Sequence, residues 1–439
     1  MEQSEAQASS KPPENLIKAG RLLAVGEVAP AIVLLEELLA EMPEQIDGLN
    51  WLGAIRGIEG RLDEAMSLLD RAAAIAPYHA GVQTNRGNVL MEMDDLTGAI
   101  AAYRDAVKFD EKAYGAMNNL AMLMNASKFP DNAARMLEMV IEKLPEYGLA
   151  HFNMCTVLGG MGRYEEALEH AKLAVEHMPK GTVSIHILAS AYMRNNDRAA
   201  AIGVVKKWIE ANPDDPEAGH VLAAVEGEGF PDRATDAYVE TLFDRFAKSF
   251  DAKLARLEYR APQLIGGVLE MLAGPPDGTL RILDAGCGTG LCAPYARAFA
   301  AHLGGADISA GMLQRAQRTG LYDQLIKGEL TAYLQSDKQP YDIVFSADTL
   351  CYFGALEAVS AGAAHSLVKG GLFTFTVEAA ASEDLTYRLD LSGRYHHGRT
   401  YVVKCLEEAG FEIIHLVQDV LRQEMGEPVI GHVVAARRR

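Results

Sequence analysis

The sequence is short of features that would assign it to several well-marked classes of protein. Its five cysteines are odd in number and scattered, with no Cys-x-x-Cys pair. Neither a disulfide framework nor a zinc site is therefore predicted, and we expect no metal. No apolar run approaches the ~18 residues that a membrane helix needs, and the polar, acidic start lacks a signal-peptide core. We expect a chain that stays in the cytoplasm and has no membrane partner.

Positive charge is also scarce. The net charge is −19, and 34 acidic and 20 basic side chains give residues 1–230 a charge of −14. Such a surface repels phosphate backbones, so nucleic acid is excluded as a partner class. What remains is a globular composition, 49% hydrophobic and 23% charged, in a 439-residue chain whose length suits two or three domains.

Small residues recur in the first half with a period of 34. One series consists of Ala31, Ala65, Ala99, Ala133, Ala167 and Ala201. A second small residue stands twelve positions before each of them, at Ala19, Gly53, Gly87, Ala121, Cys155 and Ala189. A proline follows most units about eleven residues after the alanine, and proline cannot continue a helix. Six units of two helices therefore run from residue 12 to 215.

The segment "NWLGAIRGIEGRLDEAMSLLDRAAAIAP" (50–77) resembles the tetratricopeptide repeat family. The alternative, an irregular helical bundle, does not account for six units in one register. Residues 216–227 are expected to form a helix that covers the last repeat. We thus expect a flexible N-terminus over 1–11 and an all-α repeat superhelix over 12–228.

The first helices of such repeats line a concave face. In this register the lining includes Asn50, Thr84, Asn88, Asn118, Met122, Asn125, Phe152 and His186. Asparagine amides both donate to and accept from a peptide backbone, which favours a peptide or protein in this groove. The alternative is a solvated helix face. The groove lacks the lysines and arginines with which repeats of this family clamp a C-terminal carboxylate.

From about residue 232 the repeat is replaced by strand-like runs alternating with helices. The runs cover 280–286, 303–309, 341–348, 370–378, 411–417 and 428–436. This pattern predicts a Rossmann-like α/β domain over 232–439, with a mostly parallel seven-stranded sheet and an antiparallel C-terminal edge. A glycine-rich turn after the first strand places a ligand at the carboxyl end of the sheet.

That turn reads "LDAGCGTGLC" (283–292). It is not a P-loop, because no lysine follows, and its GxGxG spacing does not match the GxGxxG dinucleotide fingerprint. Asp284 at the strand end favours a ligand with positive charge, such as the sulfonium and ammonium of S-adenosylmethionine. The candidate cofactor-binding positions in the turn are Asp284, Gly286, Cys287, Gly288 and Gly290.

Downstream residues extend this cofactor site. Asp307 closes the second strand, where a carboxylate can accept both ribose hydroxyls. Ile308 and Met312 could enclose adenine, and Glu329 with Leu330 follows the third strand, near its amino edge. Two of these residues have a structural alternative to cofactor binding. Asp307 could be a helix N-cap, and Met312 could be a core residue.

Residues 235–437 resemble class I S-adenosylmethionine-dependent methyltransferases. The segments "TLFDRFAKSFD", "ADTLCYFG" and "GRYHHGRTYV" are similar to a bacterial group of such enzymes preceded by tetratricopeptide repeats. The resemblance fails around His397, where His396 and Gly398 replace the alanine and serine of the group's pattern. It implies no particular acceptor.

Methyl transfer requires mainly alignment of the acceptor and exclusion of water, and a base only where the acceptor must lose a proton. Asp348 and Tyr352 follow the fourth strand and should face the methyl group. We expect Asp348 to position ligands, although it could cap a helix or hold the cofactor's amino-acid end. His397 is a candidate base or a surface-loop histidine.

The segment ahead of the sheet supplies further candidates. Phe243, Phe246 and Phe250 share one helix face, which either closes over the cofactor, as the resemblance implies, or packs in the core. The resemblance also implies that Tyr259 and Arg260 reach the cofactor's carboxylate. Together these patterns predict a methyltransferase whose repeats recruit the acceptor or a partner that delivers it.

Three rival functions stay open from the sequence. A nicotinamide-dependent dehydrogenase is disfavoured by the GxGxG spacing and Asp284. A small-molecule methyltransferase could use the repeats only for assembly. A repeat scaffold could carry a catalytically silent cofactor domain. The oligomeric state is not predicted.

Overall fold

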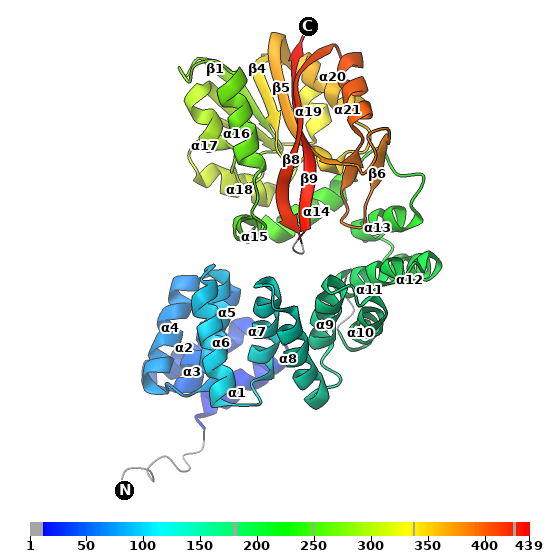
Figure 1. Ribbon diagram of the computed structural model, residues 1–439. Helices are drawn as coiled ribbons and strands as arrows, with labels where there is room; N and C mark the ends of the chain where they lie inside the picture. The colour runs from blue at the N-terminus through cyan, green and yellow to red at the C-terminus, as the bar shows by residue number, and fades with distance from the viewer. Residues whose placement is uncertain (1–11, 179–181, 248–249, 337–338, 425–426) are drawn as a thin grey trace. The chain divides into compact units, whose positions relative to one another are not determined.

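The computed structural model describes residues 12–178, 182–247, 250–336, 339–424 and 427–439 (Figure 1). The chain forms two compact units, Met1–Met178 and Pro179–Arg439. Within the described residues, no helix combines the length and the hydrophobicity required to cross a membrane.

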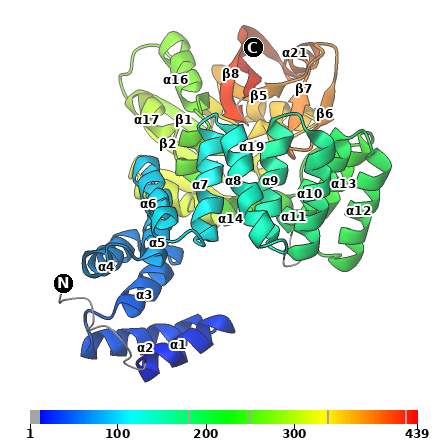
Figure 2. The ribbon, with the colours of Figure 1, turned by 60° about the horizontal axis from the view of Figure 1, so that its bottom comes forward.

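The first unit is a succession of helix pairs. Its helices are α1 (Glu14–Ala24), α2 (Val28–Glu41), α3 (Ile46–Ile58), α4 (Leu62–Ile75), α5 (Ala80–Glu92), α6 (Leu96–Phe109), α7 (Tyr114–Ala126), α8 (Pro130–Lys143), α9 (Gly148–Gly160) and α10 (Tyr164–His177). Each pair packs against the next along the chain (Figure 2).

The small residues of the 34-residue period lie where the two helices of a pair meet. A Cβ on Gly87 in α5 would lie 2.5 Å from Cε1 of Tyr103 in α6, and one on Gly53 in α3 would lie 2.8 Å from Cγ of Leu69 in α4. The alanines and the cysteine of the two series are all buried. The prediction of paired repeat helices is therefore confirmed.

The second unit contains three more repeat-like helices and the sheet with its covering helices. The helices are α11 (Thr182–Arg194), α12 (Arg198–Ala211), α13 (Pro216–Glu226), α14 (Asp236–Phe246), α15 (Phe250–Arg256), α16 (Ala261–Leu272), α17 (Ala293–Ala296), η2 (Arg297–Phe299), α18 (Ala310–Arg318), α19 (Leu330–Gln335), η3 (Leu350–Tyr352), α20 (Glu357–Ser366) and α21 (Arg399–Glu408). The strands are β1 (Leu280–Ala285), β2 (Ala300–Asp307), β3 (Gln324–Lys327), β4 (Tyr341–Ser346), β5 (Leu367–Ala379), β6 (Tyr387–Leu389), β7 (Tyr395–His397), β8 (Phe411–Glu424) and β9 (Glu427–Arg438).

Seven of these strands form the predicted sheet. Strands β3, β2, β1, β4 and β5 pair in parallel in that order, and β9 and β8 follow as an antiparallel edge. The carboxyl ends of β1, β2 and β4 therefore lie together at one edge of the sheet. This position is where an open α/β sheet binds its ligands.

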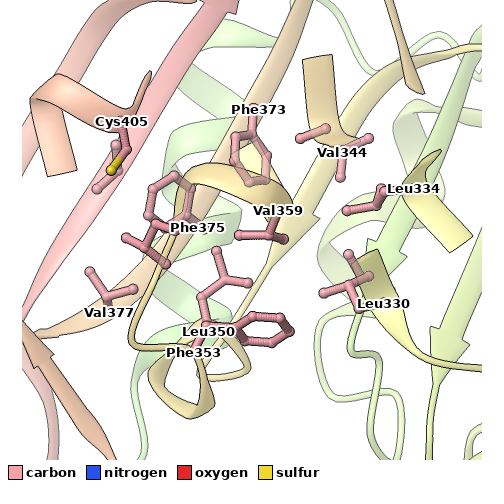
Figure 3. Close-up of a cluster of buried hydrophobic side chains, with 14 of the residues drawn as sticks. Leu330, Leu334, Val344, Leu350, Phe353, Val359, Phe373, Phe375, Val377 and Cys405 are labelled. Atoms are coloured by element: carbon pink, nitrogen blue, oxygen red, sulfur yellow. The ribbon is translucent and has the colours of Figure 1, made fainter. Parts of the chain in front are cut away.

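Two apolar layers cover the faces of the sheet. Helices α16 and α17 pack on one face, through Ile265, Leu269 and Ala293 among others. Helices α19, α20 and α21 cover the opposite face (Figure 1). Figure 3 shows this second layer, where Phe373 and Phe375 of β5 lie near Val359 and Cys405.

The β6–β7 hairpin was not predicted from the sequence. Strand β7 pairs in parallel with the last residues of β5, and β6 pairs antiparallel with β7. The loop between them binds two histidines of the repeat-like helices: Nε2 of His186 lies 3.0 Å from the Leu391 carbonyl oxygen, and Nε2 of His220 lies 2.9 Å from that of Gly393. Helix α13, expected to cover the repeats, thus also packs on the β6–β7 hairpin of its own unit.

Candidate functional site

The glycine turn after β1 adopts a left-handed backbone that side chains would disturb. Its φ angles are +82° at Gly286, +52° at Gly288 and +95° at Gly290. A Cβ on Gly286 would lie only 2.1 Å from Oγ1 of Thr349. The amides of residues 286 and 287 both donate to the carbonyl oxygen of Ala306. Glycine is therefore required both for the backbone angle and for the close approach.

Asp307, at the end of β2, lies directly against this turn. Its Oδ2 accepts from the amide of Gly288 at 2.9 Å, and its Oδ1 accepts from the amide of Ser309 at 2.8 Å. Burial raises the pKa of the Asp307 carboxyl, although these backbone bonds oppose the shift. Each oxygen of a carboxylate can accept a second hydrogen bond. Asp307 can therefore also bind a ligand's hydroxyl groups.

The turn forms one wall of a cavity that encloses about 1160 Å³ of empty space, part of it open to solvent. Ten of the residues singled out in the sequence line it: Tyr259, Gly286, Cys287, Gly288, Asp307, Ile308, Glu329, Leu330, Asp348 and Tyr352. They come from the segment before α16, from the ends of β1, β2 and β4, and from the start of α19. The sheet edge thus brings together residues almost 100 positions apart in sequence.

Three other predicted cofactor residues lie behind this wall rather than on it. Asp284 is buried and accepts from the Tyr322 hydroxyl at 2.6 Å, and burial raises the pKa of its carboxyl to about 7. Gly290 packs beside the ring of Tyr322, and Met312 is buried in α18. Asp284 therefore supports the turn from inside, and Met312 occupies the core position that the sequence left as its alternative.

Arg260 and His397 point elsewhere. Arg260 is exposed and forms an ion pair with Asp419, with Nη1 and Oδ1 2.7 Å apart. His397 is fully buried outside the cavity lining, with Nε2 3.1 Å from the Gly354 carbonyl oxygen. Burial lowers the pKa of the His397 imidazole to about 4. His397 is therefore neutral near pH 7 and holds a loop together.

The segment before the sheet covers part of the cavity. Phe243 of α14 and Phe250 of α15 line it, and the Phe243 ring packs edge-on against Tyr352 with centroids 5.4 Å apart. Phe246 does not line the cavity, and its ring lies beneath Nζ of Lys253 instead. Two of the three predicted phenylalanines therefore face the ligand space.

Two carboxylates fix this covering segment to the turn region. Oδ1 of Asp244 accepts from the Ser309 hydroxyl and from the amide of Gly311. Asp251 accepts from the Thr289 hydroxyl at 2.5 Å. Neither aspartate was singled out in the sequence, because their partners lie about 40 and 65 residues away.

A buried group of charges lies at the cavity wall near the end of β4 and was not predicted as a group from the sequence. Arg422 of β8 is 1% exposed and donates to Asp348 and Glu424 at 2.7 Å each, and also to Glu378. Arg394 donates to Glu424 at 2.6 Å. We call these five residues the charge cluster. Arg422 and Glu424 stand two positions apart on a strand, so they point to the same face, which is the signal that the sequence did offer.

Electrostatics within the charge cluster favour the charged form of Glu378. Burial opposes the ionisation of Glu378, but a hydrogen bond from His396 and the charge of Arg422 lower its pKa to about 2. Burial raises the pKa of the Asp348 carboxyl, and Arg422 opposes that shift. Asp348 also has a left-handed φ of +50°, an uncommon conformation for a residue with a side chain. Its carboxylate is thus held in one orientation.

The asparagines predicted to line the repeat groove are partly used within the repeats. Asn118 is buried, and its Oδ1 accepts from Nδ2 of Asn153 in the next repeat at 2.9 Å. Asn50 accepts in the same way from Asn85. Met122, Asn125 and Phe152 are only partly buried and remain accessible to a partner. His186 binds the β6–β7 loop, as described above.

Known families match the repeat helices and the region of the sheet separately. Residues 282–371 match a family described as a methyltransferase domain. Residues 80–112 and 158–225 match tetratricopeptide repeat families. The first match covers the glycine turn, Asp307 and Asp348, and the repeat matches cover helices α5, α6 and α10 to α13.

Two human proteins are similar to parts of the chain. Methyltransferase-like protein 27 of Homo sapiens is 44% identical over 99 residues, which are 22% of this chain and 39% of the relative. Protein O-mannosyl-transferase TMTC3 of Homo sapiens is 28% identical over 131 residues, which are 30% of this chain and 14% of that protein. The chain thus spans less than half the length of these curated relatives.

Solved structures resemble the two parts of the chain separately. Magnesium protoporphyrin IX methyltransferase from Synechocystis PCC 6803, solved with bound SAH, is 20% identical, with a TM-score of 0.36. The match covers 46% of this chain and 97% of the methyltransferase chain. The pilF protein of Pseudomonas aeruginosa is 18% identical, with coverage of 48% and 95% and a TM-score of 0.42.

Proposed function

Since the chain combines tetratricopeptide repeats with a class I methyltransferase domain, we propose that it transfers the methyl group of S-adenosylmethionine to an acceptor that the repeats help to recruit. The match to the methyltransferase family supports S-adenosylmethionine as the co-substrate. The single observation that carries the proposal is the position of Asp307 against the left-handed glycine turn, at the edge of a ligand-sized cavity.

The residues of the cavity fit this co-substrate. The glycine turn lets the backbone line the cavity without Cβ atoms in the way at residues 286 and 288. Asp307 retains lone pairs for two ribose hydroxyls. Ile308 and Leu330 offer apolar surface for adenine, and Asp348 and the aromatic rings of Phe250 and Tyr352 suit a positively charged sulfonium.

The reaction supplied by this co-substrate is an in-line displacement at an activated methyl group, which needs alignment and a dry site. Alignment alone can lower a barrier by roughly 7 to 11 kcal/mol. We assign alignment to Asp348, fixed by Arg422, and exclusion of water to Phe243 and Phe250. We assign His397 no part in the chemistry, because it lies outside the cavity.

Calorimetry of S-adenosylmethionine and S-adenosylhomocysteine binding tests the proposal. Asp307→Ala should weaken both affinities by about 1.5 to 3 kcal/mol, since two charge-assisted hydrogen bonds are lost. Asp323→Ala is the matched control, because Asp323 also accepts from a backbone amide but lies outside the cavity. Binding of a nicotinamide cofactor without binding of S-adenosylmethionine would contradict the assignment.

The proposed role of the repeats is recruitment of a basic polypeptide. The charge of −14 in residues 1–230 would attract such a partner and accelerate its approach at low salt. The partly buried Met122, Asn125 and Phe152 supply apolar and amide contacts.

The test compares methylation of a cell extract by the full chain and by Asn125→Ala combined with Phe152→Ala. Met139→Ala in α8, which removes an exposed side chain from a second repeat helix, serves as control. A loss of labelling with unchanged cofactor affinity is expected. Equal labelling by the full chain and the double variant would favour repeats that serve only assembly. A chain that does not bind the co-substrate would favour a catalytically silent domain.

A further inference from the structure

The charge cluster contains one arginine that donates to three carboxylates, Arg422, and a second arginine, Arg394, with fewer close partners. Each terminal nitrogen of Arg422 and its Nε donates to a different carboxylate, those of Asp348, Glu378 and Glu424. The charge of Arg422 is therefore compensated within the cluster by three carboxylates.

Arg394 differs from Arg422 in this respect. Its Nη1 donates to Glu424 and lies 3.7 Å from Oε1 of Glu378, and the Tyr352 hydroxyl is a further close partner. A guanidinium has five N–H donors, so several remain. Both Arg394 and Tyr352 line the cavity. Arg394 can therefore bind an acceptor's anionic group.

Two tyrosines add donors at the same end of the cavity. The Tyr259 hydroxyl has no hydrogen-bond partner among the residues that the structure describes. Burial raises the pKa of Tyr352 to about 12 and raises that of Tyr259 well above its ordinary value, so both hydroxyls stay protonated near pH 7. The wall that faces the end of β4 thus offers three donor groups.

A free proton acceptor is not found on the same wall. Over the described part of the chain, the cavity lining includes neither histidine nor lysine. Asp348 accepts from Thr376 and Arg422, and both oxygens of Glu329 accept from backbone amides of α19. Both carboxylates thus already hold hydrogen bonds within the protein, and an acceptor that is itself a carboxylate has no proton to lose and needs neither of them as a base.

We propose that the acceptor is an organic acid, bound through its carboxylate by Arg394, Tyr259 and Tyr352 and methylated on a carboxylate oxygen. A lone pair of that oxygen forms the bond to the methyl carbon, and the electron pair of the breaking carbon–sulfur bond stays on sulfur. The products are a neutral methyl ester and S-adenosylhomocysteine, and no proton is exchanged. The ester has lost the charge that Arg394 bound, which favours its release. This inference rests on the proposed methyltransferase function.

The chemical stability of the product gives a first test. The full chain is incubated with methyl-labelled S-adenosylmethionine and a cell extract, and the labelled material is treated with alkali. Methyl esters release labelled methanol, which is volatile, whereas methylated amines, thiols and phenols retain the label. Volatile label is the expected result. Alkali-stable label would overturn the organic-acid acceptor and leave the methyltransferase proposal intact, whereas a chain that binds no S-adenosylmethionine would overturn the latter.

Binding of simple probes gives a second test. It decides between the organic-acid acceptor and other acceptors even if the extract yields no label. Calorimetry compares benzoate, benzamide and benzylamine with the full chain saturated with S-adenosylhomocysteine. Benzoate should bind about tenfold or more tightly than benzamide, the effect of a charge-assisted hydrogen bond. Tighter binding of benzylamine, or no preference for benzoate, would overturn the proposal.

Paired substitutions locate the anion site without a change in net charge. Arg394→Gln with Glu424→Gln should abolish the preference for benzoate and keep the affinity for S-adenosylhomocysteine. Arg233→Gln with Asp236→Asn removes another cavity-lining ion pair and should keep the preference. If the first pair does not fold, Tyr259→Phe removes one donor only and should weaken benzoate several-fold. An unchanged preference in these variants would exclude Arg394 and Tyr259 as the anion site.

Discussion

Glu378 offers the sharpest test of how the charge cluster stabilises the second unit. Its side chain is only 4% exposed, lies near the carboxyl end of β5, and contacts both Arg422 and Nε2 of His396, the latter at 3.1 Å. Glu378→Gln retains the size and planarity of the side chain and removes its charge. The variant therefore isolates the electrostatic contribution.

The magnitude follows from the pKa of the Glu378 carboxyl. Burial opposes its ionisation, but His396 and Arg422 lower its pKa to about 2 from an ordinary value of 4.5. A carboxyl with a lowered pKa contributes stability that is present above its unfolded pKa and is lost as the pH falls toward its folded pKa. The difference corresponds to about 3 kcal/mol. Glu378→Gln should thus cost about 3 kcal/mol at pH 7, and less as the pH falls below 4.5.

His396 adds a second pH dependence of opposite sign. Burial opposes its protonation, but Glu378 raises its pKa above the ordinary 6.5. The resulting stability is complete below pH 6.5 and is lost as the pH rises through the raised pKa. Glu378→Gln should therefore also flatten the stability curve above pH 6.5.

Hydrogen exchange of the β4 and β5 amides is the suitable assay, because two compact units need not unfold together. The control is Glu412→Gln on β8, whose side chain is exposed and which should change stability by less than about 0.5 kcal/mol. Equal protection of Glu378→Gln and the parent at pH 7, or a deficit that stays the same at pH 3.5, would refute the reasoning.

Three further predictions concern packing in the repeats and the hairpin loop. Gly87→Ala should destabilise its repeat by about 1 to 3 kcal/mol, because its Cβ would overlap the Tyr103 ring. Gly115→Ala, with open space around the new Cβ, should instead stabilise by roughly 0.4 to 1 kcal/mol. Hydrogen exchange of α5 to α7 measures both variants, and equal effects on stability would contradict the packing. Asn118→Ala should cost about 1 to 3 kcal/mol by leaving the buried Asn153 amide unpaired, so stability measurements rather than peptide binding should register it. A chain of residues 179–439 should stay soluble. Further removal of α11 to α13 should expose Leu389 and Tyr395 and promote aggregation, which light scattering would measure. A soluble chain that begins near residue 230 would instead support the domain boundary expected from the sequence.

The parts of the fold that the sequence predicts are those set by local chemistry. Ala65 and Gly87 recur at a fixed period because each repeat places the same crowded contact at the same position. The glycine turn can be predicted because left-handed backbone and close approach exclude other residues. Asp307 is predictable because its distance from the turn is fixed by one strand–helix–strand unit.

The missed parts depend on contacts between distant segments. Arg422 faces Asp348 across 74 positions, and no local pattern says which carboxylate a buried arginine on an edge strand will meet. The hairpin strands β6 and β7 have only three residues each, too few for an alternating pattern to emerge. Met312 and Asp284 have the types expected of cofactor residues, but packing turns them toward the core.

The β6–β7 loop connects the cavity to the repeat-like helices of the same unit. Its carbonyl groups at Leu391 and Gly393 accept from His186 of α11 and His220 of α13, and the next residue is Arg394 of the charge cluster. The ring of His220 also stacks on Tyr238 in α14, the helix that supplies Phe243 to the cavity. Helix α13 therefore contacts both the loop that presents Arg394 and the segment that covers the ligand space. A repeat array usually ends in a helix with a polar outer face. Here the outer face of that helix is instead buried as a support for the wall of the cavity, which gives the last repeat a structural reason to be part of the unit that contains the sheet.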